Sequence, residues 1–479
     1  MPSSDDSRVL FDSFFNNVNG RSRDAPEHYH GVNPATREPL WNTPVATNED
    51  VNDAVLAAEN AFHSWSIVPF EKRAKLLEDF AELYASYEKG FTELLVRETG
   101  KPKWEIEESS KDGSAKSGAL AESLHLPVEV LEDEETIVTT RYVPLGVVAA
   151  ICPWNYPLVL SVAKIAPAIL TGNCVIVKPS PYAPYTALKL VEIAAQIFPP
   201  GVVQVLGGNE KLGPWLVDHP GIQKISFTGS VASGKIVARE AAKTLKRVTL
   251  ELGGNDASII LPDVDVISTA RQVTMGAFRN TGQVCLATKR IYIHASIYRP
   301  FLDAMHTFAQ AMKVGEPDDP DVELGPLQNE MQFRTVKALF DDTRANGFKF
   351  AAGTSEIPDS LGFFVSPAII DDPPSDSRIV TEEPFGPIVP CQPWTDEEDV
   401  IARANDTKTG LGACVWGKDT AKAKVIGRRL QAGSVFINSF EKPRPDVVVA
   451  GHKESGIGGE GGRLGLLPYC NPQAIHEYK

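Results

Sequence analysis

The stretch GVVAAIC, residues 146–152, begins a region, residues 146–250, in which short apolar runs alternate with helical patterns. An apolar run of this length between turn residues is typical of a strand that is buried on both faces. Further strands are expected at residues 174–177, 202–206, 224–227 and 247–250, with helices at 161–170, 187–196 and 233–242. Repeated β-α-β alternation predicts a parallel sheet wrapped by helices.

A second α/β region is expected after the break at Gly253-Gly254. Its predicted strands lie at residues 258–261, 290–294 and 435–438, and its predicted helices at 266–279, 298–312 and 331–346. The chain has 479 residues, which is more than one hydrophobic core usually supports. The sequence therefore predicts an α/β protein of two or three domains.

The residues before the first sheet are predicted to be polar at first and then helical. Asn48 is the expected N-cap of a helix over 49–65, in which apolar residues recur on one face. A second helix is expected at 71–89 and a third up to residue 100, and a polar helical stretch at about 104–124.

Residues 126–143 interrupt this pattern with two β-prone runs around the acidic turn 132–135. Such a pattern predicts a β-hairpin. A hairpin of this size is too small to form a domain, so we expect an arm that packs on another subunit. The expected division of the chain is residues 1–125 and 144–253, residues 254–454, and an arm of 126–143 and 464–479.

Charge and cysteine usage exclude several classes of protein. The net charge of -15 and a hydrophobic content of 43% are typical of an acidic globular protein that neither nucleic acid nor an anionic membrane attracts. No apolar run approaches the length of a membrane span. The six cysteines are scattered, without the spacing of a disulfide framework or a metal site. The start of the chain lacks the form of a signal peptide, so a cytoplasmic protein is expected.

Two segments carry candidate catalytic groups. GQVC, residues 282–285, places Cys285 in a turn after a helix, where backbone dipoles favour a thiolate. Glu251 ends an apolar strand before Gly253-Gly254, and burial would raise its pKa toward that of a general base. The loop PWNYP, residues 153–157, offers Asn155 as an amide donor, which could form an oxyanion hole with the Cys285 N–H.

The segment GSVASGK, residues 229–235, lies at a predicted strand-to-helix junction. Glycines at such a junction let a phosphate approach backbone N–H groups at the helix N-terminus. The segment is neither a Walker A motif nor GxGxxG, so on its own it indicates nucleotide binding only weakly.

These segments, in this order, resemble the motifs of the aldehyde dehydrogenase superfamily over almost the whole chain. The matching segments are residues 153–157, 178–180, 227–230, 250–254, 282–285, 382–387 and 453–456. The resemblance implies an NAD(P)-dependent enzyme of the thioester-hydrolysing type. It also implies that residues 1–125 and 144–253 form a Rossmann-like cofactor domain, that residues 254–454 form an α/β catalytic domain, and that the arm serves oligomerisation.

The family mechanism assigns the three catalytic candidates by resemblance. Cys285 would attack the aldehyde carbon, and Asn155 with the Cys285 N–H would hold the oxyanion of the thiohemiacetal. Hydride would pass to the nicotinamide and leave a thioester. Glu251 would then activate the water that hydrolyses this thioester.

The resemblance also assigns a cofactor site. Lys178 resembles the adenine-ribose ligand, Gly229 and Ser230 the pyrophosphate contact, and Glu383 the nicotinamide-ribose ligand. The full set of expected cofactor-binding residues is Trp154, Lys178, Ser180, Gly229, Ser230, Gly234, Leu252, Glu383 and Phe385. Many NAD-preferring relatives carry a glutamate at the position of Pro181. The expected cofactor is therefore NAD or NADP, with NAD favoured.

Tyr156, Arg279, Val284 and Val449 are the expected residues of the substrate pocket. Val449 replaces a family phenylalanine, which indicates a roomier pocket. Arg279 resembles the carboxylate-binding arginine of semialdehyde dehydrogenases, although the second arginine of that subfamily is Ala163 here. Arg279 is equally compatible with a structural role.

Several alternatives remain open at this stage. A semialdehyde dehydrogenase would use Arg279, and a CoA-acylating enzyme would pass the acyl group to CoA, although such relatives tend to lack Glu251. A cofactor-independent thiol esterase would need a histidine beside Cys285, for which His294 is nearest in sequence. A non-catalytic descendant would not need the set of Cys285, Glu251 and Asn155. The expected assembly is a homodimer or homotetramer with a small aldehyde as substrate and no metal.

Overall fold

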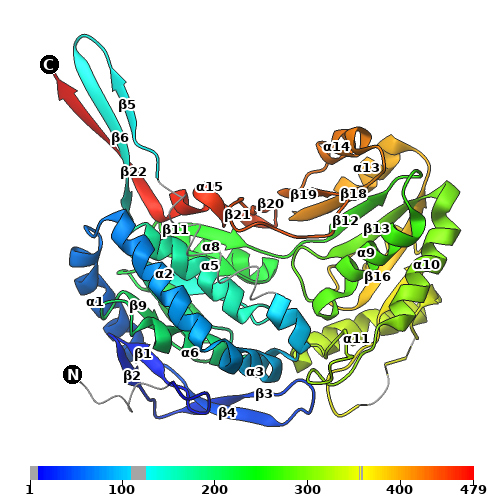
Figure 1. The fold of residues 1–479 in the computed structure, drawn as a ribbon, viewed down its shortest axis with the longest axis horizontal. Helices are drawn as coiled ribbons and strands as arrows, with labels where there is room; N and C mark the ends of the chain where they lie inside the picture. Colours follow the sequence, from blue (N-terminus) through cyan, green and yellow to red (C-terminus); the bar gives the residue numbers. More distant parts are fainter. Residues whose placement is uncertain (1–8, 109–125, 355, 358–359) are drawn as a thin grey trace.

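The computed structural model describes residues 9–108, 126–354, 356–357 and 360–479. Two helix-covered sheets lie next to each other, and a narrow three-stranded sheet projects from the first of them (Figure 1). The α/β fold class predicted from the sequence is confirmed. Among the helices of the described ranges, none is both long enough and apolar enough to cross a lipid bilayer.

The first sheet has eight strands in the order β2-β1-β9-β8-β7-β10-β11-β21. Its five central strands run parallel and are almost entirely buried, as their apolar runs predict. The two edges are antiparallel, because β1 pairs with β9 and β21 with β11. The strands are β1 (Asn16–Val18), β2 (Arg21–Arg23), β7 (Val147–Ile151), β8 (Cys174–Lys178), β9 (Val203–Val205), β10 (Lys224–Thr228), β11 (Arg247–Glu251) and β21 (Gly456–Ile457).

Two groups of helices cover this sheet: α2, α5 and α6 pack together, while α7 packs on α1 and on α8. The expected N-cap of the first helix is wrong. Thr47, not Asn48, is the cap, because its hydroxyl accepts the Asp50 N–H while the Asp50 carboxylate accepts the Thr47 N–H. The helices are α1 (Asn48–Trp65), α2 (Phe70–Ser86), α3 (Glu88–Thr99), α5 (Pro157–Leu170), α6 (Tyr185–Ala194), α7 (Leu212–Asp218) and α8 (Val231–Ala242).

The polar helix expected at 104–124 is helical at residues 103–108, and the rest of that stretch lies outside the described residues. A separate hairpin of β3 (His28–Val32) and β4 (Pro39–Pro44) precedes α1.

The second sheet has seven strands in the order β14-β15-β16-β13-β12-β18-β19, all parallel except the edge strand β14. Successive residues of β12 face opposite sides: Ile260 packs with α9 and α10, and Ile259 packs in the cluster on the other face. The strands are β12 (Asp256–Ile260), β13 (Thr288–His294), β14 (Lys349–Ala352), β15 (Ala368–Asp371), β16 (Ile388–Trp394), β18 (Gly412–Trp416) and β19 (Ser434–Ile437).

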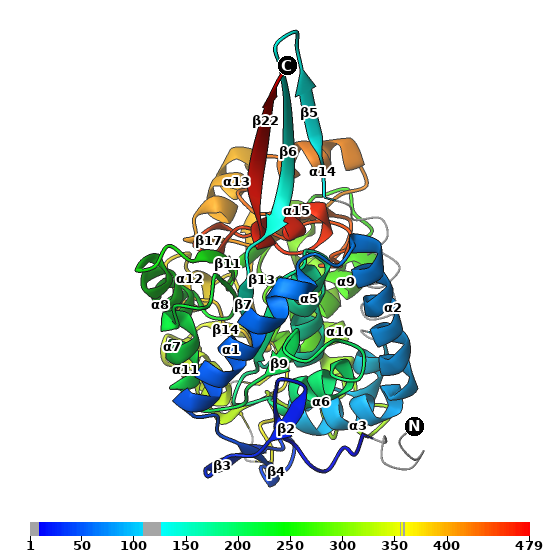
Figure 2. The same ribbon diagram turned by 90° about the vertical axis from the view of Figure 1, so that its left-hand side faces the viewer.

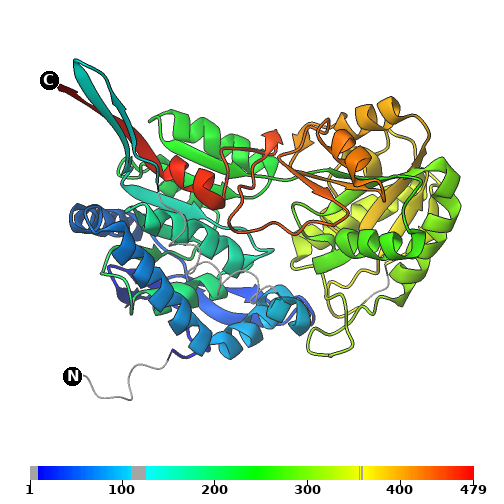
Figure 3. The same ribbon diagram turned by 45° about the horizontal axis from the view of Figure 1, so that its top comes forward.

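The helices around the second sheet are α9 (Val266–Phe278), α10 (Tyr298–Ala311), α11 (Glu330–Ala345), α12 (Arg378–Thr381), α13 (Glu397–Asn405) and α14 (Thr420–Gly427). After β19 the chain returns to the first sheet (Figure 3), where β21 adds to its edge. On this path β20 (His452–Lys453) pairs with β17 (Thr409–Gly410). Residues 252–255 and this returning segment are two connections that link the sheets.

The third sheet confirms the predicted hairpin. It consists of β5 (Glu129–Glu132), β6 (Thr136–Pro144) and β22 (Cys470–Tyr478), and β22 pairs with β6 along its whole length. The sheet extends away from the two larger sheets (Figure 2). Before β22, α15 (Gly462–Leu466) and a 3-10 turn (Leu467–Tyr469) pack against the first sheet region.

Candidate active site

Cys285 lies in a turn between the 3-10 segment η1 (Arg279–Gly282) and β13. Three consecutive residues before it have positive φ angles: Asn280 at 50°, Thr281 at 54° and Gly282 at 74°. This conformation is unfavourable for a β-branched residue such as Thr281 and costs about 1–3 kcal/mol for a non-glycine residue. Strain of this kind persists only where the surrounding contacts hold it.

Hydrogen bonds hold this turn from both sides. The Asn280 Nδ2 donates to the Gln283 carbonyl at 3.1 Å, and the Gln283 Nε2 donates to the Asn280 carbonyl at 3.0 Å. The Thr281 hydroxyl donates to the Gly325 carbonyl at 2.8 Å. A Cβ on Gly282 would lie 2.3 Å from the Gly386 carbonyl oxygen, so no side chain fits there. The backbone that presents the Cys285 thiol is therefore rigidly fixed.

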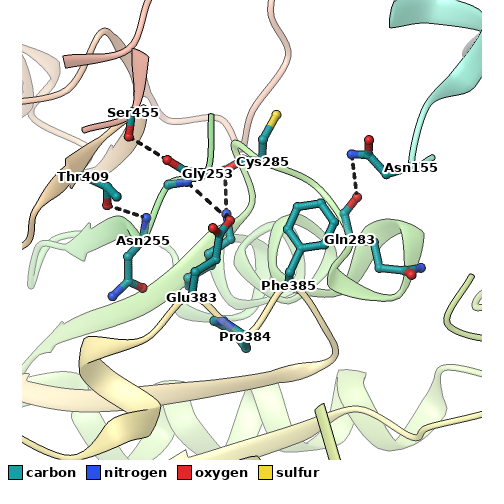
Figure 4. A network of polar contacts seen from close by, with 12 residues as sticks. Asn155, Gly253, Asn255, Gln283, Cys285, Glu383, Pro384, Phe385, Thr409 and Ser455 are labelled. Atoms are coloured by element: carbon teal, nitrogen blue, oxygen red, sulfur yellow. Dashed lines mark hydrogen bonds and ion pairs between the residues drawn. The ribbon is translucent and has the colours of Figure 1, made fainter. Parts of the chain in front are cut away.

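Asn155 reaches this turn from the first sheet. It follows β7, is buried, and its Nδ2 donates to the Gln283 carbonyl at 3.1 Å (Figure 4). The prolines at the two ends of PWNYP, Pro153 and Pro157, fix the loop, and Pro157 is the first residue of α5. The structure thus brings a neutral amide donor to the carbonyl of Gln283, which lies two residues before Cys285.

Glu251 ends β11 and is buried. Burial and the nearby Glu460 carboxylate raise the pKa of Glu251 to about 7, while Lys164, the Cys285 thiol and the Thr228 hydroxyl oppose this shift. Within the described residues neither Glu251 oxygen has a well-formed hydrogen bond. Glu251 and Cys285 therefore lie together, and the carboxylate keeps free acceptor positions.

The Cys285 thiol is half-buried, unlike the other five cysteines, which are buried. Burial and the Glu251 carboxylate raise the pKa of the Cys285 thiol well above its ordinary value, and Lys289 opposes them. The thiol is therefore protonated at neutral pH and needs a base to become a nucleophile.

A buried charge network lies behind Glu251. Lys164 of α5 pairs with Glu460 and donates to the Thr228 hydroxyl at 2.7 Å. Burial alone would lower the pKa of Lys164, but the Glu460 carboxylate outweighs it and the pKa is raised. The Ser226 hydroxyl also contacts Glu460, at 3.4 Å. Lys164 and Glu460 act on Glu251 electrostatically and were not predicted from the sequence.

The candidate phosphate-binding residues surround the N-terminus of α8. Ser230 is its N-cap, and the Ser230 hydroxyl accepts the Ser233 N–H at 3.2 Å. Gly229 precedes it, where a Cβ would lie 2.6 Å from the Phe227 ring. Gly234 lets α8 pack on Leu252, because a Cβ there would lie 2.5 Å from the Leu252 side chain. A helix N-terminus with small residues fits a phosphate group.

Lys178 and Ser180 lie at the end of β8. The Lys178 Nζ is buried and donates to the Pro179 carbonyl at 2.9 Å, and burial lowers its pKa to about 8. Ser180 forms an isolated bridge with Ala183. A buried ammonium group that donates to a neutral carbonyl fits the hydroxyl groups of a ribose, so these residues are compatible with a dinucleotide.

Glu383 and Phe385 belong to the loop before β16 and lie near the thiol turn (Figure 4). The Glu383 Oε1 accepts the Gly254 N–H at 3.3 Å and pairs with the Lys289 Nζ at 3.1 Å. The Phe385 ring packs edge-on against Trp154, with 5.4 Å between the ring centroids. Trp154 belongs to the first sheet region and Phe385 to the second, so this pair joins the two.

Two of the four pocket candidates, Tyr156 and Arg279, face the same carboxylate, that of Glu105. Tyr156 donates to the Glu105 carboxylate at 3.2 Å. The Arg279 guanidinium faces the same carboxylate at 3.6 Å and Glu108 at 3.4 Å. Val284 lies next to Cys285 and is half-buried. Val449 pairs with Glu460 in an isolated bridge, next to the charge network rather than to Arg279.

His294 does not contact Cys285. Its Nδ1 lies 2.8 Å from the Ser296 hydroxyl, and its ring packs edge-on on Trp394 at 4.8 Å. The histidine that a thiol esterase would need is thus engaged at the far end of β13.

Three functional candidates were missed by sequence reasoning: Lys164, Lys289 and Glu460. Two of them had a signal. Lys164 is the one charged residue in the apolar segment PLVLSVAKIAPAIL of α5, and Lys289 directly precedes the strand expected at 290–294. A lysine that is fully buried is rare unless it is paired. Glu460, in a glycine-rich segment, had no such signal.

Known proteins resemble this chain over nearly its whole length. The sequence model described as "Aldehyde dehydrogenase family" matches residues 21–475. Aldehyde dehydrogenase LUC3 of Fusarium sp is 45% identical over 98% of this chain and 100% of that protein. Peroxisomal aminoaldehyde dehydrogenase 2 of Malus domestica is 34% identical over 93% of this chain and 92% of that protein.

Solved structures show the same fold. The NAD+ complex of aldehyde dehydrogenase from Bacillus cereus matches with a TM-score of 0.93 and 32% identity, covering 97% of this chain and 96% of that one. The NAD+ complex of betaine aldehyde dehydrogenase from Staphylococcus aureus matches with a TM-score of 0.93 and 31% identity, covering 97% and 95%.

Proposed function

Because this chain belongs to the aldehyde dehydrogenase family, we propose that it oxidises an aldehyde to the carboxylic acid through a covalent thioester on Cys285. One observation carries this proposal. The thiol of Cys285 and the carboxyl of Glu251 lie together, and the amide of Asn155 contacts the same turn. A nucleophile, a base and an oxyanion donor are what acyl transfer through a thiol requires.

The first step is the activation of the thiol. Glu251 takes the thiol proton, and the Cys285 Sγ forms a bond to the aldehyde carbon. The carbonyl oxygen becomes an oxyanion, which the Asn155 Nδ2 and the Cys285 N–H stabilise by hydrogen bonds. A bound nicotinamide cofactor would supply the acceptor for the hydride of this carbon, which would thereby be oxidised to the carbonyl carbon of a thioester on Cys285.

Hydrolysis completes the cycle. Because the pKa of Glu251 is about 7, it can first lose the proton that it took from the thiol. Glu251 then takes a proton from a water molecule, whose oxygen bonds to the thioester carbon, and the C–S bond breaks to release the acid while Glu251 returns this second proton to the Cys285 thiolate. Thr228, Lys164 and Glu460 form a buried polar path beside it, along which we propose that the first proton leaves.

The cofactor is proposed to be NAD or NADP. Lys178 and Ser180 would hold the adenine ribose, with Gly229, Ser230, Gly234 and Leu252 around the pyrophosphate. Glu383, Phe385 and Trp154 would hold the nicotinamide ribose. NAD is favoured by its presence in the Bacillus cereus and Staphylococcus aureus complexes. Pro181, however, carries no charge that would repel a 2′-phosphate.

Pro181→Glu tests this cofactor assignment. A carboxylate three residues after Lys178 would repel the 2′-phosphate of NADP and accept the 2′-hydroxyl of NAD. The expected result is a fall of roughly tenfold or more in kcat/KM with NADP, with little change for NAD. Steady-state kinetics with both cofactors measures it, and Tyr182→Glu is the control because Tyr182 is the exposed neighbour. Equal losses for both cofactors would contradict the assignment.

The substrate is proposed to be an aldehyde that need not carry a carboxylate. The Arg279 guanidinium already faces the carboxylates of Glu105 and Glu108, so a substrate carboxylate would have to compete with two negative charges. Tyr156, Val284 and Val449 are proposed as other pocket residues.

A panel of aliphatic, aromatic and carboxylated aldehydes, run with NAD and NADP, tests the function. Absence of reduced cofactor with every aldehyde would contradict it.

Asn155→Ala tests the oxyanion role. The variant loses the amide donor but keeps the thiol and the base, so kcat is expected to fall by roughly 10²- to 10³-fold. Binding of the cofactor should not change. Asn280→Ala is a useful comparison, because Asn280 donates to the same Gln283 carbonyl from within the turn and its loss should lower thermal stability as well. Full activity in Asn155→Ala would remove Asn155 from the mechanism.

We also propose that the chain divides into a cofactor domain (1–125 and 144–253), a catalytic domain (254–454) and an assembly arm (126–143 and 464–479). The three-stranded sheet projects from the body (Figures 1 and 2) and exposes Val130, Leu131 and Ile475. Exposed apolar side chains on a sheet of this kind favour burial against another copy. We therefore propose a homodimer or homotetramer. A cytoplasmic location is also proposed, because the scattered cysteines are typical of a reducing compartment.

Charges on the arm test the assembly. The double variant Val130→Asp/Leu131→Asp is expected to reduce the mass in solution to that of one chain, because buried carboxylates would oppose association. Ile67→Asp is the matched control, since Ile67 is 80% exposed on the body of the protein. Size-exclusion chromatography with light scattering measures the mass. A wild-type protein that is already monomeric would contradict the proposal.

A further inference from the structure

Lys289 is a buried lysine that lies beside the thiol turn and does not take part in the proposed reaction steps. It belongs to β13 and is 2% exposed. Its Nζ donates to the Cys285 backbone carbonyl at 2.5 Å and pairs with the Glu383 Oε1 at 3.1 Å. One ammonium group therefore contacts both the nucleophile's own backbone and the carboxylate assigned to the nicotinamide ribose.

The surroundings of Lys289 are acidic. The carboxyl groups of Asp256, at the start of β12, and Glu441, in the segment after β19, lie close enough to act on it electrostatically. Burial raises the pKa of Asp256 to about 8 and that of Glu441 to about 7, so at neutral pH Asp256 is largely protonated and Glu441 is about half protonated. Glu383 is the carboxylate that forms the ion pair with Lys289.

Glu383 is also tied to the connection between the two sheets. It accepts the Gly254 N–H, and a Cβ on Gly253 would lie 2.1 Å from the Glu383 Oε2. The Gly253 carbonyl in turn accepts the Ser455 hydroxyl at 2.7 Å (Figure 4). A change in the position of Glu383 would thus alter its ion pair with Lys289 and its hydrogen bond to the Gly254 N–H in the connection between the sheets.

We infer that Lys289 is a positioning residue that holds the Cys285 turn and the Glu383 carboxylate in one arrangement, and so couples the cofactor site to the nucleophile. This inference rests on the proposed function of both residues. Burial raises the pKa of Glu383, and Lys289 opposes this shift and orients the carboxylate for ribose hydroxyl groups. The charge of Lys289 also favours the thiolate of Cys285. The groups that face Cys285 are Glu251, Asp256, Tyr156 and Lys289, of which Lys289 is the cation.

Lys289→Met is the test, with two readouts that need no turnover. The first is the pH profile of Cys285 alkylation by iodoacetamide, followed at the Cys285 peptide by mass spectrometry. Its midpoint is expected to move upward by about one pH unit, because a nearby positive charge no longer favours the thiolate. The second is the Kd for NAD+ by isothermal titration calorimetry, which is expected to rise roughly tenfold because Glu383 loses its charged partner.

A double-mutant cycle separates this role from a general loss of stability. Glu383→Gln alone should weaken NAD+ binding, and adding Lys289→Met to it should weaken binding no further, because the two residues act as a pair. Lys189→Met is the matched control: Lys189 is also buried and paired, with Glu192, but lies on α6 away from the thiol. It should leave both readouts unchanged. Lys289→Arg, which keeps the charge, should restore part of both effects.

The outcomes distinguish the inference from the proposed function. If the wild-type protein neither binds NAD+ nor reacts at Cys285, the proposed function fails. If it does both and Lys289→Met matches it in midpoint and Kd, the inference is overturned while the function stands. Should Lys289→Met not fold, Lys289→Gln serves the same comparison, and additive losses with Glu383→Gln would equally overturn the coupling.

Discussion

Cys285→Ala is expected to lower aldehyde oxidation by a factor of at least about 10³, because no other group in the described part of the site can form the covalent bond to the aldehyde carbon. Loss of the thiol removes the step that makes hydride transfer possible, not merely one contact to the substrate. The effect should therefore appear in kcat as well as in kcat/KM, and steady-state formation of reduced cofactor measures it.

The control for this variant is Cys391→Ala. Cys391 is a buried thiol on β16 whose neighbours are Tyr298 and Asp371, not the thiol turn. It should retain the wild-type rate, apart from a modest loss of thermal stability from the small cavity. Binding of NAD+ should survive in Cys285→Ala. Substantial oxidation by Cys285→Ala would contradict the covalent mechanism.

Glu251→Gln is expected to lower steady-state turnover by roughly 10²- to 10⁴-fold, because the amide cannot take the proton of the thiol or of the water.

The wild-type pH profile supplies a second test. The pKa of Glu251 is raised to about 7, so the carboxyl is protonated and inactive as a base below that pH and ionised above it. The rate should therefore rise with pH through about 7, and this limb should vanish in the variant.

Glu98→Gln is a matched control for Glu251→Gln. Both carboxyls are buried, and burial raises the pKa of each to about 7. Glu98, however, accepts the backbone N–H groups of Tyr185 and Thr186, so it is a structural acceptor. Its variant should lose stability and keep the pH profile of the wild type. An unchanged profile in Glu251→Gln would show that another group is the base.

The parts of the fold that were predicted from the sequence are those with a local signal. The strands β7 and β8 were found because apolar runs of four to six residues between turn residues are typical of buried strands. The edge strand β21 was not found, because two residues, Gly456 and Ile457, pair with β11 about 200 positions earlier in the chain. Likewise, the sequence offers two adjacent polar residues, Thr47 and Asn48, as the cap of α1. The structure uses Thr47, because Thr47 and Asp50 form reciprocal hydrogen bonds between side chain and backbone.

The candidate site shows the same division. Cys285, Glu251 and Asn155 could be identified because each lies in a short segment with an unusual combination of residues. The charge partners could not be paired in this way. Lys164 and Glu460 are 296 residues apart, and whether a buried lysine meets a carboxylate depends on how two distant segments pack. The same holds for Arg279, whose partners Glu105 and Glu108 lie about 170 positions earlier in the chain and alter its proposed role.

The most direct test of the central claim is the detection of the acyl group on Cys285. Glu251→Gln is mixed with aldehyde and NAD+ at alkaline pH, where the Cys285 thiol can ionise without the base, and is then quenched in acid. It is expected to hold the thioester long enough for peptide mass spectrometry. The mechanism predicts an added acyl mass on the peptide that contains Cys285, and no such mass when NAD+ is omitted or when Cys285→Ala is combined with Glu251→Gln. An acyl mass on another residue, or reduced cofactor formed without any acyl-enzyme, would contradict it.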